Sequence, residues 1–327
     1  MDNILNQTFF QKYKIPICAI FAAVVAVFFF YHFFISAPSD FPAGSIVTVQ
    51  KGDVLTEISH SLKDRHIIRS EVAFQFFSIL FSSDRRVIAG DYYFEHKTPV
   101  YEAAYRLSHG RYGLSVVKTT LPEGSTVYEM SKILGNKLPY FDKDEFMKRA
   151  GTKEGYLFPD TYFFFPTARA DEIIKLMSDT FTQKIDSIKT EIASSGRKLS
   201  DIITMASIVE KETNKDEDRR IVAGILWKRI KLGMALQVDA PFLYIKETAD
   251  NNREVTLDDL KINSPYNTYT HRGLTPTPIG NPGLAAILAS AQPKETPYLF
   301  YLYDRNGMIH YAKTFEEHKK NKELYLH

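Results

Sequence analysis

The stretch MASIVEKET, residues 205–213, holds the residues best suited to acid–base chemistry. If it is helical, Ala206, Ser207 and Glu210 share one face, because residues three and four apart lie together on a helix. Small side chains beside a carboxylate leave room for a ligand. The apolar neighbours Ile208 and Val209 would disfavour the charged form of Glu210, which suits a general acid. From the spacing alone, however, a glutamate on the helix surface or in an ion pair is the favoured interpretation of Glu210.

Other catalytic patterns find little support in the sequence. Glu212 would point almost opposite to Glu210, so the two cannot be the facing carboxylates of an ordinary glycosidase. No GxxxxGK[ST] loop, HExxH helix or GxSxG elbow is present. The SVVK at 115–118 fits SxxK, but it falls in an expected strand and no KTG accompanies it.

Three further segments combine aromatic rings with amides, hydroxyls and carboxylates. They are EGYLFPDTY at 154–162, with Glu154 and Tyr156; LQVDAP at 236–241, with Gln237 and Asp239; and NSPYNTYTHRGLTPTPIGNPG at 263–283, with Tyr266 and Asn267. Sugar sites use this mixture, because rings stack on pyranose faces while polar groups bond the hydroxyls. For the prolines at 276, 278 and 282 we prefer a loop held by its own turns.

Several helices must position these segments. The apolar periodicity predicts helices over 171–196, 199–213 and 216–232, and a short one over 283–291. Residues 263–282 are too rich in Asn, Thr, Gly and Pro for a long element and predict a structured loop. A terminal hairpin is expected from 299–303 and 308–312, with Asn306-Gly307 in the turn.

An upstream region, residues 45–112, shows strand, helix, helix, strand and a further helix from 98 to 107. Strands are expected at 46–49 and 87–94. The spacing of VQKGDV, followed by Glu57, Ile58 and Leu62, recurs in LPEGST at 121–126 and the residues after it. Two copies of a strand–turn–helix unit can also arise by chance. Residues 46–94 resemble a LysM module, a small βααβ fold that binds glycans; a purely structural role is equally open.

The apolar run IPICAIFAAVVAVFFFYHFFI, residues 15–35, predicts a transmembrane helix, because about 20 apolar residues span a bilayer core. A cleaved signal peptide has a shorter apolar region and a better cleavage site than the SAPS that follows. Lys12 and Lys14 precede the run, so we expect residues 1–14 in the cytoplasm and the rest outside. Residues 36–44 form a linker in this interpretation.

The length, composition and net charge of the chain limit the remaining classes of function. The chain has 327 residues, 44% apolar and 24% charged, which is enough for two globular domains after the anchor. A net charge of +2, spread along the chain, argues against a nucleic-acid partner. Cys18 is the only cysteine, so residues 36–327 can form neither a disulfide nor a thiolate metal site.

Together the strings EGYLFPDTY, ASIVEKET, LQVDAP, NSPYNTYTHRGLTPTPIGNPG and QPKETPYLFYLYDRNGMIHYAKTFEEH closely resemble the MltG/YceG family of endolytic murein transglycosylases. The order and spacing agree over residues 45–327. The family often has threonine where Ala240 stands, and it varies around Leu274-Thr275. The resemblance implies an α+β protein with a transmembrane helix, a LysM-like βααβ subdomain at 45–112 and a mixed α/β catalytic domain at 113–327.

The resemblance also implies a mechanism. Glu210, at the family's catalytic position, would be the sole catalytic acid/base and would first protonate the glycosidic oxygen between N-acetylmuramic acid and N-acetylglucosamine. It would then accept the proton of the muramoyl C6 hydroxyl, which attacks C1 of the same sugar and leaves a 1,6-anhydro end. No cofactor or metal is implied. Ser207, Gln237, Asp239, Tyr266 and Asn267, with Glu154 and Tyr156, are the expected substrate contacts.

The cellular setting follows from the same resemblance. It implies a single-pass protein of the cytoplasmic membrane that cuts nascent peptidoglycan strands outside the cell and ends their elongation, with penicillin-binding synthases as partners. Two rivals remain. One is a non-catalytic, membrane-anchored scaffold that binds peptidoglycan, and the other is a hydrolase that uses water and leaves a reducing end.

Overall fold

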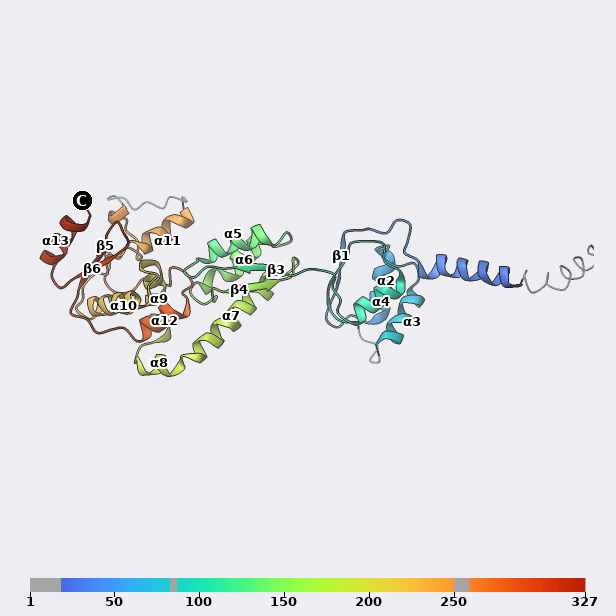
Figure 1. Cartoon of the computed structure of the whole chain (residues 1–327), viewed down its shortest axis with the longest axis horizontal. Coiled ribbons are helices and arrows are strands. Elements are labelled where there is room, and N and C mark those ends of the chain that lie inside the picture. The colour runs from blue at the N-terminus through green and yellow to red at the C-terminus, as the bar shows by residue number, and fades with distance from the viewer. Residues whose placement is uncertain (1–18, 83–86, 250–258, 327) are drawn as a thin grey trace, which may run out of the picture. The chain divides into compact units, whose positions relative to one another are not determined.

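The computed structural model describes residues 19–82, 87–249 and 259–326. The chain divides into two compact units, Met1–Ser115 and Val116–His327 (Figure 1). Both units combine helices with short antiparallel strand pairs, so the predicted α+β class is confirmed.

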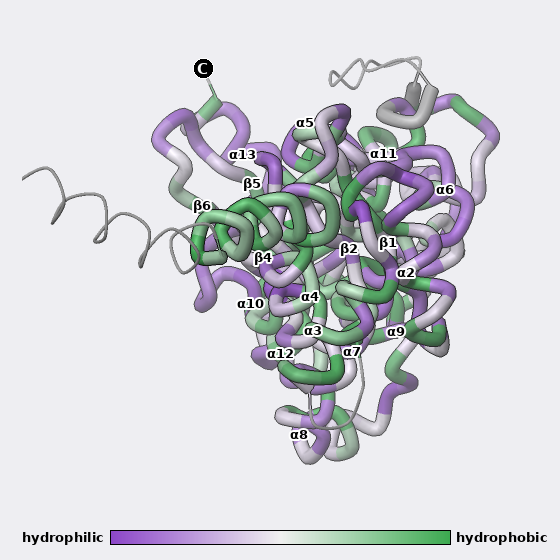
Figure 2. Tube along the Cα trace, turned by 90° about the vertical axis from the view of Figure 1, so that its right-hand side faces the viewer, coloured by the Kyte–Doolittle hydropathy of each residue, from purple (hydrophilic) through white to green (hydrophobic). Residues whose placement is uncertain are grey.

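The N-terminal apolar run is helical where it is described. Residues 19–30 form an α-helix, and Tyr31–Ile35 continue it as a wider π turn (Figure 2, green). In the part of the chain that the structure describes, we find no helix with the length and apolar character needed to cross a membrane. Residues 15–18 of the predicted span, and the predicted tail 1–14, lie outside the described residues.

The first unit has the expected βααβ order followed by one helix. Its elements are β1 (Ser45–Val49), α2 (Leu55–Asp64), α3 (Glu71–Phe81), β2 (Gly90–Phe94) and α4 (Val100–Ser108). The strands pair antiparallel, with Ser45 opposite Phe94. Alternate strand residues such as Val47 and Tyr92 turn inward against Leu62 of α2 and Leu107 of α4. Burial of these side chains supplies the main driving force for folding this unit.

The second strand is shorter than predicted. A strand over 87–94 was expected, but β2 begins at Gly90, which lies opposite Val49, the last residue of β1. Beyond that point no described segment pairs with the chain as a strand, and the amide of Ile88 instead donates to the carbonyl of Leu107 at 3.0 Å. The length of β1 therefore limits β2.

The second unit begins with the same succession of elements. These are β3 (Val117–Thr120), α5 (Val127–Lys137), α6 (Lys143–Ala150) with the turn Gly151–Lys153, β4 (Thr161–Phe164) and α7 (Ala170–Ser187). Strands β3 and β4 pair antiparallel, with Val117 opposite Phe164. The repeat noted in the sequence therefore extends over both strands and all three helices of each copy. We call residues 45–108 and 117–187 the first and second βααβα copies.

The turns that open the two helices α2 and α5 explain why the sequence repeat is recognisable. Gly52 and Gly124 have φ of +106° and +76°, values that favour glycine. Three residues into each helix a glutamate bonds back to the amide that precedes the helix, Glu57 to Val54 and Glu129 to Thr126. Such capping fixes where each helix begins.

The rest of the second unit is mostly helical. Its elements are α8 (Lys189–Ser194), α9 (Leu199–Glu212), α10 (Asp216–Lys231), α11 (Ala240–Ala249), a 3₁₀ turn Asp259–Lys261, α12 (Leu284–Ala291), β5 (Phe300–Tyr303), β6 (Ile309–Ala312) and α13 (Phe315–Tyr325). Helices α9, α10 and α12 pack together (Figure 1). The loop over 263–282 and the terminal hairpin agree with expectation, whereas a single helix over 171–196 is wrong. It breaks at Ile188, whose φ of −121° and ψ of 22° are not helical.

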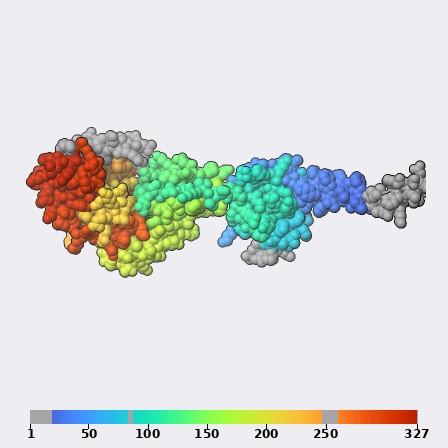
Figure 3. All heavy atoms as spheres, viewed as in Figure 1, coloured from blue at the N-terminus to red at the C-terminus, as the bar shows by residue number. Residues whose placement is uncertain are grey.

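The C-terminal hairpin is held to α10 by buried and half-buried polar contacts. The guanidinium of Arg229 donates to the carbonyl of Leu299 at 2.8 Å, and the hydroxyl of Tyr311 donates to Asp218 at 2.8 Å. In Figure 3 these red C-terminal residues lie against the yellow and orange residues of the same unit. The hairpin thereby covers one side of the α9–α10–α12 core.

Candidate active site

A cavity of about 680 Å³ opens in the second unit, within the size range of small-ligand sites. Its walls come from the turn between β3 and α5, from α5 itself, from the last turn of α9 and from the first turns of α11. Carboxylates dominate its polar lining. The acidic lining residues are Glu123, Glu129, Glu210, Glu212 and Asp239, and the basic ones are Lys132 and Lys211.

Glu210 is held at both of its carboxylate oxygens. Its side chain is 5% exposed and belongs to the last turn of α9. Arg219 of α10 donates to Oε1 at 2.7 Å, and the backbone amide of Gly283 donates to Oε2 at 2.8 Å. Gly283 is the residue before α12, so this oxygen also lies at the positive end of a helix dipole. The carboxylate is thus fixed in one orientation.

These partners correct one expectation. The sequence suggested apolar surroundings that disfavour the charged form of Glu210, and Ile208 and Val209 are indeed fully buried. However, the immediate neighbour of the carboxylate is not apolar: it is the guanidinium of Arg219, which is only 8% exposed and pairs with Glu210 at 2.7 Å. Apolar residues next in sequence point into the core between helices, away from the carboxylate.

Glu123 is the second carboxylate next to this position. A Cβ built on Gly283 would fall 1.9 Å from Oε1 of Glu123, so the carboxyl group lies directly against the glycine backbone. Partial burial and the negative charge of Glu210 raise the pKa of Glu123 above its ordinary value. Glu123 belongs to the repeated turn LPEGST, and its place in the sequence indicated no catalytic role.

Glu212 and Asp239 form a second acidic pair, further along the same wall. The hydroxyl of Tyr301 donates to Glu212 at 2.8 Å, and burial raises the pKa of Glu212 to about 7. The hydroxyl of Tyr269 donates to Asp239 at 2.7 Å. Both acids also line a neighbouring cavity of about 370 Å³, together with Gln237. This neighbouring cavity contains the aromatic and amide groups that suit a sugar.

Gln237 lies in an unusual backbone conformation at the edge of that cavity. Its φ is +50°, and its amide donates to the carbonyl of Thr268 at 3.0 Å. The side chain is exposed. Positive φ costs energy in a residue with a side chain and is often found at functional sites. The predicted residues Glu210, Asp239 and Gln237 therefore face the two cavities.

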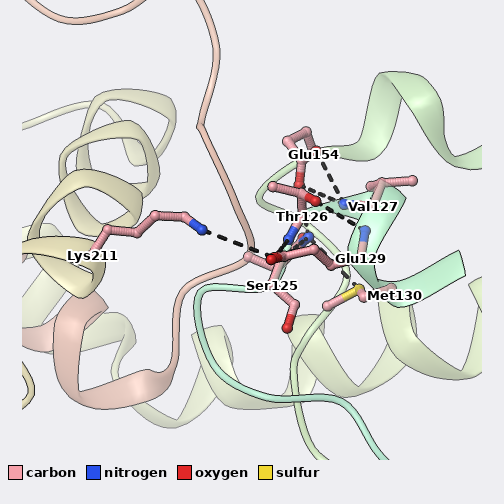
Figure 4. A network of polar contacts seen from close by, with 8 residues as sticks. Ser125, Thr126, Val127, Glu129, Met130, Glu154 and Lys211 are labelled. Carbon is pink, nitrogen blue, oxygen red and sulfur yellow. Dashed lines mark hydrogen bonds and ion pairs between the residues drawn. The ribbon is translucent and has the colours of Figure 1, made fainter. Parts of the chain in front are cut away.

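Three other predicted contacts are buried and bonded inside the protein. Ser207 accepts from the amide of Ile279 at 3.0 Å, and Asn267 donates to the carbonyls of Leu260 and Ile262. Glu154 accepts from the amide of Val127 with both oxygens at 3.1 Å (Figure 4). None of these side chains lines either cavity. Each holds a loop or a helix start that borders the cavities.

Tyr156 and Tyr266, also predicted as contacts, are half-buried. The ring of Tyr156 packs edge-on against Phe181 with centroids 5.3 Å apart. The hydroxyl of Tyr266 lies 2.7 Å from that of Thr277. Neither residue lines a cavity wall, and substrate contact by either stays a prediction.

Asn281 is the buried residue that connects these parts, a role that was not predicted from the sequence. Its side-chain oxygen accepts from the amides of Gly155 and Leu157, and its side-chain nitrogen donates to Glu154 at 2.8 Å and to the carbonyl of Ser125 at 3.0 Å. Figure 4 shows the part of this network around the start of α5, with Lys211 reaching towards Glu129. The sequence signal was its place among glycines and prolines in GNPG.

Arg219 was also missed. It follows Glu210 by nine residues, across the turn that joins α9 to α10, and it donates to Asp216 at 2.6 Å as well. A basic residue in the first turns of a helix is unfavourable beside the helix dipole. This unfavourable position is the sequence signal that could have indicated that Arg219 pairs with a buried acid.

A polar cavity with a fixed, buried carboxylate and further acids around it is typical of an enzyme that works by acid–base catalysis. The comparisons with known proteins give this class a family. The model of the YceG-like family matches residues 47–324, and the chain belongs to this family.

Relatives and a solved structure agree with this assignment. An endolytic murein transglycosylase of Bacillus subtilis (strain 168) is 29% identical over 307 residues, covering 86% of this chain and 84% of that protein. An endolytic murein transglycosylase of Streptococcus pneumoniae (strain D39) is 33% identical over 172 residues, covering 51% of this chain and 31% of that longer protein. The crystal structure of a YceG-like protein from Listeria monocytogenes matches with a TM-score of 0.57 at 26% identity, covering 85% of this chain and 99% of that chain.

Proposed function

We propose that this protein is an endolytic murein transglycosylase. It cleaves the β-1,4 bond between N-acetylmuramic acid and N-acetylglucosamine within glycan strands and leaves 1,6-anhydro-N-acetylmuramic acid ends. Such cuts in nascent strands end their elongation. The observation that carries the proposal is the buried carboxylate of Glu210, held by Arg219 and Gly283 at the wall of the larger cavity. The activity named for the Bacillus subtilis relative supports it.

The reaction requires the protein to donate one proton to the substrate and to accept one proton from it. The glycosidic oxygen must be protonated as the C1–O bond breaks, and the C6 hydroxyl of the same muramoyl residue must lose its proton as it attacks C1. The nucleophile belongs to the substrate, so the protein needs neither an activated water nor a carboxylate on the opposite face of the sugar. In the simplest scheme Glu210 performs both transfers in turn.

The two adjoining cavities suit an extended substrate. They share the wall formed by Glu212 and Asp239. A strand that passes Glu210 can continue along this wall, with Gln237, Asp239 and Tyr269 bonding its hydroxyls and Phe300 offering an apolar face. A site open in this way accepts the interior of a strand, which endolytic cleavage requires.

The experiment uses purified full-length protein and isolated sacculi, with mass spectrometry of the released fragments. Anhydro ends that disappear in Glu210→Gln support the proposal, with a rate loss of at least about 10²-fold from removed acid–base catalysis. Reducing ends would establish a hydrolase instead. Binding without cleavage would establish a scaffold. Glu217→Gln is the matched control, because that carboxylate is 68% exposed and pairs with Lys294 at the surface.

We further propose that the protein is anchored in the cytoplasmic membrane by residues 15–35, with the second unit outside. The exposed side chains of Ile20, Phe28 and Phe33 support this, because such a surface is unfavourable in water. The exposed Val72, Phe76 and Leu80 of α3 add an apolar surface suited to the bilayer face. Loss of the protein from the membrane fraction on deletion of residues 1–36 tests the anchor; unchanged membrane association would contradict it.

The first βααβα copy is proposed as a glycan-binding unit of the LysM type. A small hollow of about 150 Å³ lies beside its opening turn, lined by Asp53, Glu57 and Ser61 among others. The equivalent positions of the second copy, Ser125, Glu129 and Ile133, line the larger cavity. Binding of sacculi that weakens in Asp53→Ala without a change in cleavage chemistry is expected. Penicillin-binding synthases complete the proposal as partners, testable by co-purification.

A further inference from the structure

The reaction proposed above places its two proton transfers on one face of the sugar ring. In a β-linked muramoyl residue the leaving oxygen on C1 and the C6 hydroxymethyl group project from the same side of the pyranose. An acid and a base for these steps must therefore lie side by side. This differs from ordinary glycosidases, whose two carboxylates flank the bond.

Glu210 is suited to only one of the two steps. At rest its oxygens accept from the guanidinium of Arg219 at 2.7 Å and the amide of Gly283 at 2.8 Å. Both partners are hydrogen-bond donors, and a carboxylate whose two oxygens accept from fixed donors is well placed to act as a base. The glycosidic oxygen needs a separate proton donor at the start, because both oxygens of Glu210 are already engaged by donors of the protein.

Glu123 lies where the missing donor would have to be. Its Oε1 lies against the backbone of Gly283, the residue whose amide bonds Glu210. Next along the chain, Gly124 packs on the Glu210 side chain, since a Cβ there would fall 3.2 Å from Cγ of Glu210. Both carboxylates line the same cavity. They are therefore neighbours on one wall and do not face each other across the cavity.

The charges that face Glu123 favour its protonated form. They are Glu210 of α9, Arg219 and Asp216 of α10, and Asp160 before β4, so one cation stands against three acids. Among the described residues no hydrogen bond or ion pair to the Glu123 side chain is found, whereas Arg219 is already engaged by Glu210 and Asp216. Burial and these acids raise the pKa of Glu123, so the group retains its proton to higher pH than an ordinary glutamate.

We propose that Glu123 is a second catalytic residue, the general acid of the reaction, with Glu210 as its base. The proton of Glu123 passes to the glycosidic oxygen as the C1–O bond breaks, and N-acetylglucosamine leaves with a free C4 hydroxyl. The C6 oxygen forms the new bond to C1 and its proton passes to Glu210. Transfer of that proton back to Glu123 restores the starting state, with no water consumed.

Glu212 is the rival for this role, because its pKa is raised to about 7. Its neighbours are different, however. The charge that acts on it is that of Asp239, and its oxygen accepts from Tyr301. The geometry therefore pairs Glu212 with Asp239 and Glu123 with Glu210, and only the latter pair includes the carboxylate at the family's catalytic position.

The test compares two leaving groups on the full-length protein. One substrate is a glycan strand, and the other is a muramoyl glycoside with a 2,4-dinitrophenyl leaving group, which departs without protonation. On the glycan, kcat of Glu123→Gln should fall by about 10²-fold or more. On the dinitrophenyl substrate it should return to within about tenfold of the unaltered protein, whereas Glu210→Gln stays inactive on both because the base is lost.

The pH profile gives a readout that a merely structural role would not move. Activity on the glycan should fall as pH rises through the raised pKa of Glu123, because its acid form is consumed. On the dinitrophenyl substrate Glu123→Gln should lack this fall. The variant's far-ultraviolet circular dichroism and melting temperature, compared with those of Glu217→Gln, check that it is folded.

Failure of the acid role of Glu123 can be distinguished from failure of the proposed function. If the unaltered protein forms no anhydro ends, both the function and this inference are wrong. If it forms them and Glu123→Gln is as active as Glu217→Gln, only the inference is wrong. If Glu123→Gln loses equal activity on both substrates, the acid role of Glu123 is likewise wrong. It is also wrong if the dinitrophenyl substrate restores the activity of Glu212→Gln and not that of Glu123→Gln. Both outcomes leave the proposed function intact.

Discussion

At the scale of single residues, the site depends on how each carboxylate is partnered. Glu210 has a buried cation and a helix-terminal amide, and Glu212 has a tyrosine hydroxyl, whereas the Glu123 side chain has no such partner among the residues that the structure describes. Different environments can give neighbouring carboxyl groups different pKa values. One cavity can then hold both a general acid and a general base at the same pH. Sequence neighbours alone could not reveal this difference.

Arg219→Gln should destabilise the protein and lower its activity. It leaves the charge of Glu210 buried without its cation, and breaking a buried ion pair in this way costs about 3 kcal/mol. Urea unfolding measures this loss. The double variant Arg219→Gln/Glu210→Gln should recover part of it because the unpaired charge is gone. A double variant less stable than either single one would contradict the pairing.

Glu212 makes stability depend on pH. Its pKa is raised to about 7 in the folded state from the ordinary 4.5, so the folded state binds more protons between these values. The stabilisation is complete below about pH 4.5 and is lost as pH rises through 7. Between pH 5 and pH 8 the protein should lose about 2 kcal/mol relative to Glu212→Gln in urea unfolding. Parallel pH profiles of the two proteins would contradict this.

At the scale of elements, the cavity lies between the turn before α5, α5 itself, the end of α9 and the start of α11, and the residue before α12 contacts its wall at Glu210. Asn281 holds this region together, since its side chain bonds Gly155, Leu157, Glu154 and the carbonyl of Ser125 from a fully buried position. Gly283, two residues on, then presents its amide to Glu210. This loop, rich in glycine and proline, thus holds the surrounding elements in place through its buried side chain.

Asn281→Ala should remove these bonds and leave buried amides unpaired. Each unsatisfied group costs about 1–3 kcal/mol, so a loss on the order of 3 kcal/mol or more in unfolding free energy is expected. The rate should also fall, because the Gly283 amide is no longer held against Glu210. Urea unfolding and initial rates on sacculi give the two numbers. An unchanged rate in a destabilised variant would show that the loop does not position the site.

The sequence allowed the elements to be predicted better than the contacts. Helices α9, α10 and α12 and the terminal hairpin followed from apolar periodicity and an Asn-Gly turn. Helix α11 was not predicted, and the break at Ile188 was missed because that residue continues the apolar pattern while its backbone leaves the helix. Local patterns record which face is buried and carry less information on where a helix bends.

The candidate site shows the same limit. Glu210 was found from its motif, but Ser207, Asn267 and Glu154 proved to be bonded within the protein. A polar residue in a distinctive motif can hold a loop or bind a ligand, and its type is the same in both cases. Glu123 lies far from Glu210 in the sequence, and only folding brings the two carboxylates to one wall.

At the scale of the whole molecule, one βααβα arrangement is used twice. Leu62 of the first copy and Leu134 of the second are equivalent, 72 residues apart, and both are fully buried. The opening turn of the second copy lines the larger cavity, whereas that of the first borders only a small hollow of about 150 Å³. The two copies thus share a fold, but their opening turns line different cavities.

This matched pair gives a prediction. Leu62→Ala and Leu134→Ala should each cost about 2–5 kcal/mol through loss of a buried side chain. Limited proteolysis should then open residues 45–115 first in the former and the second unit first in the latter. The cleavage rate should fall only in Leu134→Ala, because α5 carries the cavity wall. An equal fall in Leu62→Ala would show that the first copy is required for the chemistry.

The most direct test of the central claim follows the oxygen of water. Cleavage of sacculi by the full-length protein in water enriched with oxygen-18 should give new muramoyl ends that carry none of the label, because the C6 hydroxyl of the substrate is the nucleophile. The same ends should be missing with Glu210→Gln. New ends that contain one oxygen-18 atom at C1 would show attack by water and contradict the account.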